Sequence, residues 1–246
     1  MRFFIELSYK GTNYHGWQQQ PNANSIQQEI NKALSTILNV NMEVMGAGRT
    51  DSGVHAKQMF AHFDCNIDFK IQDIIFKLNN FLPIDIAIHD IFKVNNDANC
   101  RFDALNRVYQ YHIIHEKNPF NKTAYLFQKD LDIKAMNDAC QYIIGKQDFT
   151  SFSKANTQTF TNDCDVILAK WEVVNNEFIF TIKANRFLRN MVRAIVGTLL
   201  QVGIGKIASG DVPKIIAAKD RCESGRSVPA HALFLIEVKY PNKIRI

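Results

Sequence analysis

The residues best suited to chemistry lie between Gly46 and Ala56, in the sequence Gly-Ala-Gly-Arg-Thr-Asp-Ser-Gly-Val-His-Ala. Three of the chain's 11 glycines bracket one carboxylate there, Asp51, and glycine allows backbone geometry that side chains would forbid. Arg49 lies two residues earlier, so in an extended stretch both side chains leave on the same side. There the guanidinium can hold the carboxylate ionised or bind a phosphate. The loop therefore predicts a charged site for an anionic substrate.

A second basic element is the segment from Arg186 onward, which predicts a helix with two unlike sides. Apolar residues cover its wide side, whereas a narrow stripe is shared by Arg186, Arg189, Asn190, Arg193 and Gly197. The helix carries no acidic partner for these arginines, so phosphate contacts are favoured over an ordinary solvated face. The glycine on the stripe predicts a close approach by another segment.

Two tyrosines share one face of a predicted strand, in the sequence Arg107-Val108-Tyr109-Gln110-Tyr111. For Tyr109, which has Arg101 upstream, both a stacking or proton-transfer role and plain packing stay open. The same ambiguity holds for Tyr14 and Trp17, the two aromatic residues of a turn-rich early loop.

Several other chemistries are disfavoured around Asp51. Glycoside hydrolysis usually needs two carboxylates, and no second acid lies near Asp51 in the sequence. His55 could orient Asp51 or act as a base, although a single nearby histidine is more often structural. The seven histidines show no HxxxH or HxH spacing, which argues against a metal site. A phosphate-binding loop of the Gly46-x-Gly48 type is also disfavoured, because neither a GK[ST] ending nor a helix follows it.

Alternating strands and helices must position these residues. In the first half, the patterns predict a strand containing Phe3 to Tyr9, a helix from Ile26 capped by Ser25 with Gln28, strands at Val40–Met45 and Met59–Cys65, a helix over Ile71–Leu82 and a strand over Ile86–Val94. In the second half, they predict a strand over Arg107–His115, a helix from Ile133, a hairpin of Val166–Val174 with Phe178–Ala184 turning at Asn175-Asn176, the helix from Arg186, a short helix from Ser209 to Ala218 and a strand over Leu233–Tyr240.

These elements predict an α+β fold made of two halves. Residues 1–103 form an N-terminal half with the Asp51 loop, and residues 104–246 form a C-terminal half with the tyrosine strand and the arginine helix. We expect helices on one side of a mainly antiparallel sheet that the halves share, which is consistent with duplication. The cleft where the halves meet is the expected site.

Composition bounds the remaining classes. With 246 residues and 46% hydrophobic content, the chain can bury a sizeable core, and its formal charge of +5 is mild for a partner of polyanions. The cysteines are odd in number and form no CxxC pair, which argues against a disulfide framework and a zinc site and favours location in a reducing cytoplasm. They are Cys65, Cys100, Cys140, Cys164 and Cys222. No apolar run approaches the ~20 residues of a membrane helix, and no signal-type segment opens the chain.

Together these residues resemble the tRNA pseudouridine synthase A family, nearly end to end. The GRTDxGVHA signature stands complete at Gly48–Ala56. Further blocks match in order: Tyr14-x-Gly16-Trp17-Gln18, Arg107-x-Tyr109-x-Tyr111, Asp148–Phe152, Asn185 to Arg193, and Ala217–Arg221. Three places depart from the family's pattern. Lys10 replaces a usual acid, and Ala98-Asn99-Cys100-Arg101 keeps only the arginine and the small spacer of the family's FHAR block. The family's closing GLYL block is replaced by Ala232–Leu235.

The resemblance implies an isomerase that converts uridine to pseudouridine in the tRNA anticodon stem-loop, at positions 38, 39 and 40. It makes Asp51 the nucleophile, Tyr109 the residue that stacks on the uracil and accepts a proton, and Arg193 the partner of Asp51. Arg49 would hold the flipped-out nucleotide, and we expect Arg189 and Arg101 to bind substrate. It also implies two ferredoxin-like halves with a basic cleft, a homodimer that binds tRNA, and no metal or redox cofactor. An RNA-binding module without activity and an enzyme acting on a free nucleotide stay as alternatives.

Overall fold

The computed structural model describes residues 1–154 and 160–246. Within them the chain forms a mixed α/β fold with five α-helices, and the strands pair mostly antiparallel. The chain divides into two compact units, which we call unit 1 and unit 2. Unit 1 consists of Met1–Leu105 with Phe234–Ile246, and unit 2 consists of Asn106–Leu233. None of the helices in the described residues is long and apolar enough to cross a membrane.

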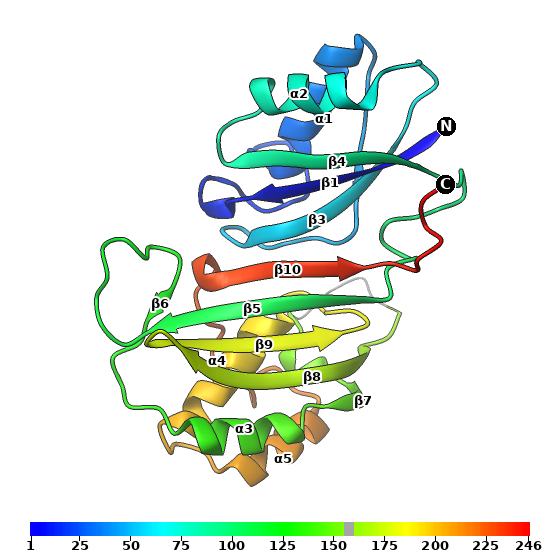
Figure 1. The fold of residues 1–246 in the computed structure, drawn as a ribbon. Coiled ribbons are helices and arrows are strands. Elements are labelled where there is room, and N and C mark those ends of the chain that lie inside the picture. Colours follow the sequence, from blue (N-terminus) through cyan, green and yellow to red (C-terminus); the bar gives the residue numbers. More distant parts are fainter. Residues whose placement is uncertain (155–159) are drawn as a thin grey trace. The chain divides into compact units, whose positions relative to one another are not determined.

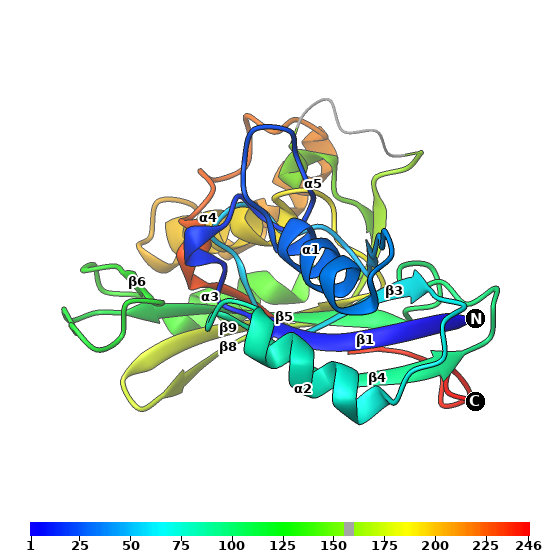
Figure 2. The same cartoon turned by 90° about the horizontal axis from the view of Figure 1, so that it is seen from above.

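Unit 1 is a sheet in the order β4-β1-β3-β10 with two helices on one face (Figures 1 and 2). Its elements are β1 (Arg2–Tyr9), α1 (Ile26–Leu38), β2 (Met45–Gly46), β3 (His55–Asp64), α2 (Ile71–Phe81), β4 (Ile86–Val94) and β10 (Leu233–Lys239). β1 pairs antiparallel with both β3 and β4. α2 packs against β4 and α1. Because Tyr9 pairs with Ala56, this arrangement places the loop that follows β1 next to the loop that precedes β3.

The C-terminal strand differs from its predicted assignment. The sequence predicted that residues 104–246 all belong to one half, whereas β10 runs parallel to the start of β3, with Phe234 opposite His55 and Leu235 opposite Ala56. The short strand β2 pairs antiparallel further along the same edge of β3, at Ala61 and His62. Both strands therefore shield the edge of the strand that follows the Asp51 loop.

Unit 2 is a sheet in the order β5-β9-β8-β7, with α3, α4 and α5 on one face (Figure 2). Its elements are β5 (Asn106–Ile114), β6 (Tyr125–Leu126), α3 (Ile133–Gln141), β7 (Gly145–Asp148), β8 (Asp163–Val174), β9 (Glu177–Ala184), α4 (Met191–Gly203) and α5 (Val212–Ala218). The predicted hairpin is confirmed, because Asn175 and Asn176 adopt φ values of 50° and 64° and join β8 to β9.

Most predicted elements are present, but some of them differ from the prediction in their bounds. The helix capped by Ser25 is confirmed, since Gln28 N donates to Ser25 Oγ over 3.3 Å. The predicted strand at Val40–Met45 is wrong, since only Met45 and Gly46 pair with β3. The short helix expected from Ser209 begins as a 3-10 turn and becomes α-helical at Val212.

Candidate active site

The Asp51 loop is held by backbone contacts with the early loop that follows β1. Trp17 N donates to Thr50 O over 3.3 Å, just before Asp51, and Gly53 N donates to Tyr14 O over 3.3 Å, just after it. The loop also turns on itself, because Val54 N donates to Asp51 O over 3.1 Å. The half-buried Asp51 is thus fixed from both sides along the chain.

Two glycines let the early loop come this close. Gly16 has φ +93°, and a Cβ there would lie 2.4 Å from Thr50 O and 3.2 Å from the carbonyl carbon of Asp51. A Cβ on Gly11 would lie 2.0 Å from Val54 O. Carbon and oxygen do not approach so closely without displacement, so both positions require glycine. The sequence predicted a turn-rich loop here but not this close packing of the two loops.

Trp17 and Tyr14, left ambiguous by the sequence, are core residues. Trp17 is 1% exposed, and its indole lies where a Cβ on Gly46 would stand, 2.4 Å from the nearest ring atom. Tyr14 is buried, and its hydroxyl donates to Asp85 Oδ1 over 2.6 Å. Burial and this hydrogen bond raise the pKa of Tyr14 well above its usual value. Neither aromatic ring is therefore available to stack on a substrate.

His55 also has a structural role, as the sequence analysis favoured. It is 1% exposed, and its Nδ1 accepts a hydrogen bond from Gly11 N over 2.9 Å. Its ring packs against Phe234, with centroids 4.6 Å apart. Because Nδ1 is the acceptor, the proton of the neutral ring lies on Nε2. His55 thus ties the start of β3 to the early loop.

Arg49 is exposed and contacts the early loop. Its Nε donates to Gln18 Oε1 over 3.1 Å. The sequence predicted that this guanidinium contacts a carboxylate or a phosphate, and it gave no sign of the contact with the Gln18 amide. The hydrogen bond uses Nε, so the two Nη groups can bind other partners. Two such groups on one guanidinium can donate side by side to a phosphate.

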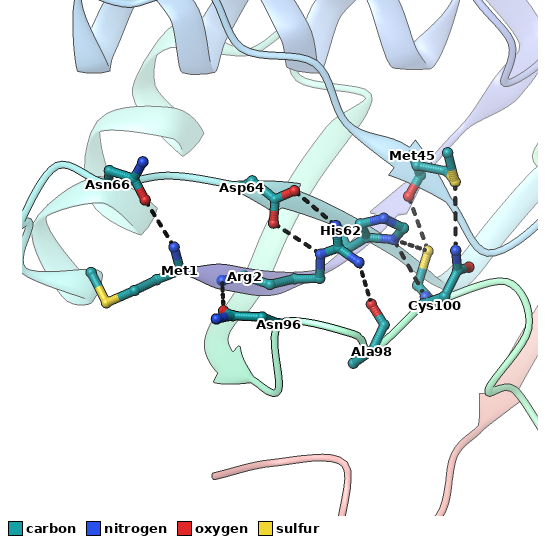
Figure 3. A network of polar contacts seen from close by, with 10 residues as sticks. Met1, Arg2, Met45, His62, Asp64, Asn66, Asn96, Ala98 and Cys100 are labelled. Carbon is teal, nitrogen blue, oxygen red and sulfur yellow. Dashed lines mark hydrogen bonds and ion pairs between the residues drawn. The ribbon is translucent and has the colours of Figure 1, made fainter.

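The loop that carries Arg101 is anchored by a polar network (Figure 3). Cys100 N donates to His62 Nδ1 over 3.3 Å, and the Cys100 thiol donates to Met45 O over 3.0 Å. Upstream, Arg2 Nη1 donates to Ala98 O over 2.9 Å. Because Met45 leads into the Asp51 loop, the network links the exposed Arg101 to the strand from which that loop starts.

The titrating groups of this network have shifted pKa values. Burial lowers the pKa of His62, and the charge of Arg2 adds to this effect. Arg2 also donates to both carboxylate oxygens of Asp64, over 2.9 and 2.8 Å, and these bonds lower the pKa of Asp64. The network therefore holds a neutral imidazole beside a charged pair.

In unit 2, the structure separates the two tyrosines of β5. Tyr111 is fully buried, its hydroxyl donates to Pro229 O over 2.9 Å, and burial raises its pKa far above the usual value. Tyr109 is half-buried and makes an edge-to-face contact with Phe187, with centroids 5.1 Å apart. Tyr111 is thus a core residue, whereas Tyr109 keeps part of its surface accessible.

The predicted helix from Arg186 is wrong at its start. α4 begins at Met191, because Asn190 adopts φ +68° and interrupts the helical geometry. Arg186 and the exposed Arg189 therefore precede the helix, and of the three arginines only Arg193 lies on it. The continuous stripe of three arginines that the sequence suggested is not present.

Arg193 is held by the segment that follows α5. Its Nε donates to Val228 O over 2.7 Å, and Val228 N donates to Arg193 O over 3.2 Å. The close approach expected at Gly197 is confirmed, because a Cβ there would lie 1.9 Å from Arg226 O. These two hydrogen bonds, one from the Arg193 side chain and one to its backbone, fix the direction in which the side chain leaves α4.

The site residues predicted from the sequence fall into two groups. Unit 1 holds Arg49, Asp51 and Arg101, and unit 2 holds Tyr109, Arg189 and Arg193. Throughout residues 1–154 and 160–246, no three His, Cys, Asp or Glu side chains gather in a way that could hold a metal ion. The chemistry available from these groups is that of one carboxylate, one phenol and several guanidinium groups.

Comparison with known proteins decides the family. A family model described as tRNA pseudouridine synthase matches residues 7–103 and 139–241. The chain belongs to this family. Its members are isomerases that convert uridine to pseudouridine, so this chain is an isomerase. The matched residues include the Asp51 loop, Arg101 and α4, whereas Tyr109 lies between the two matched segments.

Full-length relatives extend the similarity across the family. The chain is 48% identical to tRNA pseudouridine synthase A of Parabacteroides distasonis, over 99% of this chain and 97% of the relative. It is 49% identical to the protein of that name from Bacteroides thetaiotaomicron, over 99% of this chain and 92% of the relative. A more distant relative of the same name, from Francisella tularensis, is 38% identical over 97% of this chain and 94% of the relative.

Proposed function

We propose that this chain isomerises uridine to pseudouridine in the anticodon stem-loop of tRNA, at positions 38, 39 and 40, with Asp51 as the nucleophile. The observation that carries the proposal is the braced loop of Asp51, in which Gly16 brings the early loop into contact with the backbone at Thr50 and Asp51. A carboxylate that must attack a single carbon atom needs such fixed placement.

In the proposed reaction, Asp51 begins the breaking of the bond between C1' of the ribose and N1 of uracil. The freed base turns, a bond forms between C1' and C5, the proton on C5 leaves, and N1 gains a proton. These steps balance without an oxidant or reductant, so the reaction requires no redox cofactor. Tyr109 is the proposed stacking partner of the uracil and acceptor of the C5 proton, which suits a phenol with part of its surface accessible.

The arginines have separate proposed roles. Arg193 would pair with Asp51 and keep it ionised, which suits a guanidinium whose Nε is already bound to Val228 O. Arg49 would hold the flipped-out nucleotide, and this contact would help to offset an unstacking cost of a few kcal/mol. Arg189 and Arg101 are exposed and would bind phosphates.

We also propose the assembly that the family resemblance implies. Two ferredoxin-like halves would share a sheet and form a basic cleft for the tRNA, and two chains would form a homodimer. The proposed location is the cytoplasm, where the five free cysteines would stay reduced; burial raises the pKa of the Cys140 thiol to about 12.

Mapping pseudouridine in total RNA from a deletion strain tests the proposal. We expect the anticodon-arm pseudouridines to be missing and to return when the wild-type gene is restored. Their persistence in the deletion strain would contradict the proposal. Activity on uridine monophosphate equal to that on an anticodon stem-loop would favour a free-nucleotide enzyme instead.

A further inference from the structure

A chain of side-chain amides leads from the body of unit 1 to Arg49. It begins at Val44 O, passes through Gln27 on α1 and Gln18 in the early loop, and ends at the Arg49 guanidinium. Gln18 closes the matched block Tyr14-x-Gly16-Trp17-Gln18, Gln27 lies outside the matched blocks, and the proposed mechanism gives neither residue a role. We propose that Gln18, aimed by Gln27, is the positioning residue for Arg49, an inference that rests on the proposed role of Arg49.

The orientation of Gln27 is fixed by backbone groups at both ends of its amide. Gln27 Nε2 donates to Val44 O over 2.7 Å, and Gln27 Oε1 accepts from Gln19 N over 2.9 Å. A flipped amide would place two donors against each other at Gln19 and two acceptors against each other at Val44. The backbone therefore decides which end of Gln27 faces Gln18.

That choice decides the orientation of Gln18 in turn. Gln27 presents an acceptor, so the Gln18 amide donates to it through Nε2 over 2.7 Å. Its carbonyl oxygen Oε1 is then directed to Arg49 Nε, 3.1 Å away. Gln18 is half-buried whereas Arg49 is exposed, so the amide is the fixed partner and the arginine is the one being held.

The arrangement suits a side chain that must hold a flipped-out nucleotide. A free arginine loses rotamer entropy when it becomes ordered, and a hydrogen bond that orders it beforehand lowers that cost when RNA binds. The bond uses Nε, so the Nη groups stay available for a phosphate or a base edge. Gln18 would therefore raise the rate of the step that needs Arg49 in place, with little effect on overall tRNA affinity.

The test compares Gln18→Met and Gln27→Met with Gln28→Met. Methionine keeps the length of glutamine and removes its hydrogen bonds, and Gln28 is an exposed neighbour on α1 outside the amide chain. In single-turnover reactions on an anticodon stem-loop, we expect about a tenfold lower rate constant for Gln18→Met, consistent with losing a hydrogen bond to a charged group. We expect a smaller loss for Gln27→Met and no change for the control.

Two readouts separate positioning from a general structural effect. In an Arg49→Ala background, Gln18→Met should cause no further loss of rate, because the two residues act as one unit. In the free protein, the Arg49 Nε–H proton should exchange with solvent faster in Gln18→Met than in the wild type, as measured by nitrogen-detected NMR.

The outcomes are distinct. Rate losses that multiply in the double variant, or an unchanged Arg49 Nε–H exchange rate, would overturn the assignment of Gln18. If the wild-type protein formed no pseudouridine in the stem-loop, the proposed function would fail, and the exchange measurement would still decide whether Gln18 holds Arg49.

Discussion

Gly16 allows the sharpest test of how the early loop supports Asp51. In Gly16→Ala, the new Cβ would lie 2.4 Å from Thr50 O, about 1 Å closer than an ordinary contact. The backbone at φ +93° is also unfavourable for alanine, at a cost of about 1–3 kcal/mol. Separating the loops would stretch the bond from Trp17 N to Thr50 O, which adds about 1 kcal/mol. We therefore expect unfolding free energy to fall by about 2–4 kcal/mol.

Activity should fall further than stability alone requires. A shift of about 1 Å next to a nucleophile can cost about 10²-fold in rate, so we expect the single-turnover rate constant on an anticodon stem-loop to fall by that order at a temperature where the variant is folded. Gly210→Ala is the control, because a Cβ there meets nothing within 4 Å. Urea unfolding and the rate assay should both be measured. A Gly16→Ala variant with wild-type stability and a rate within about twofold of wild type would refute the bracing of Asp51.

Three further predictions concern other residues. Arg189→Ala should weaken tRNA affinity broadly and reduce the slope of log affinity against log salt by about 0.7–0.9, as titrations at several salt concentrations would measure; an unchanged slope would remove Arg189 from the phosphate contacts. Tyr109→Phe should lower turnover by about 10²-fold and leave tRNA affinity nearly unchanged, and an equal loss in both would contradict its proton-transfer role. Burial lowers the pKa of His62, so below pH 6.5 the unfolded state binds a proton that the folded state does not. The free energy of unfolding should therefore decrease as the pH is lowered, by up to about 1.4 kcal/mol for each pH unit. His62→Gln should flatten that fall in thermal unfolding between pH 7 and 5, and identical profiles would contradict the shift.

The sequence predicted those elements whose signals are local. The helix after Ser25 has its own cap, α2 ends before Pro83, and the β8–β9 hairpin turns at two asparagines. Each of these depends on residues close together in the chain. The strand Ile86–Val94 matched its predicted bounds for the same reason, since its apolar run lies between turns.

The sequence could not predict features that depend on distant contacts. The start of α4 depends on the left-handed backbone of Asn190, whose Nδ2 donates to Ser227 Oγ over 2.5 Å, far along the chain. The parallel pairing of β10 with β3 joins segments from opposite ends of the sequence. The amides of Gln18 and Gln27 appeared only as polar loop and helix residues, because their order in space depends on backbone groups at Val44 and Gln19.

The central claim is that the Asp51 carboxylate is the nucleophile of a uridine isomerisation. The most direct measurement is pseudouridine formation in an anticodon stem-loop by Asp51→Asn, which keeps the shape of the side chain and removes its charge. We expect no pseudouridine after many wild-type turnover times, with tRNA affinity and the unfolding transition close to those of the wild type. Pseudouridine formation by Asp51→Asn at a rate near that of the wild type would contradict the account.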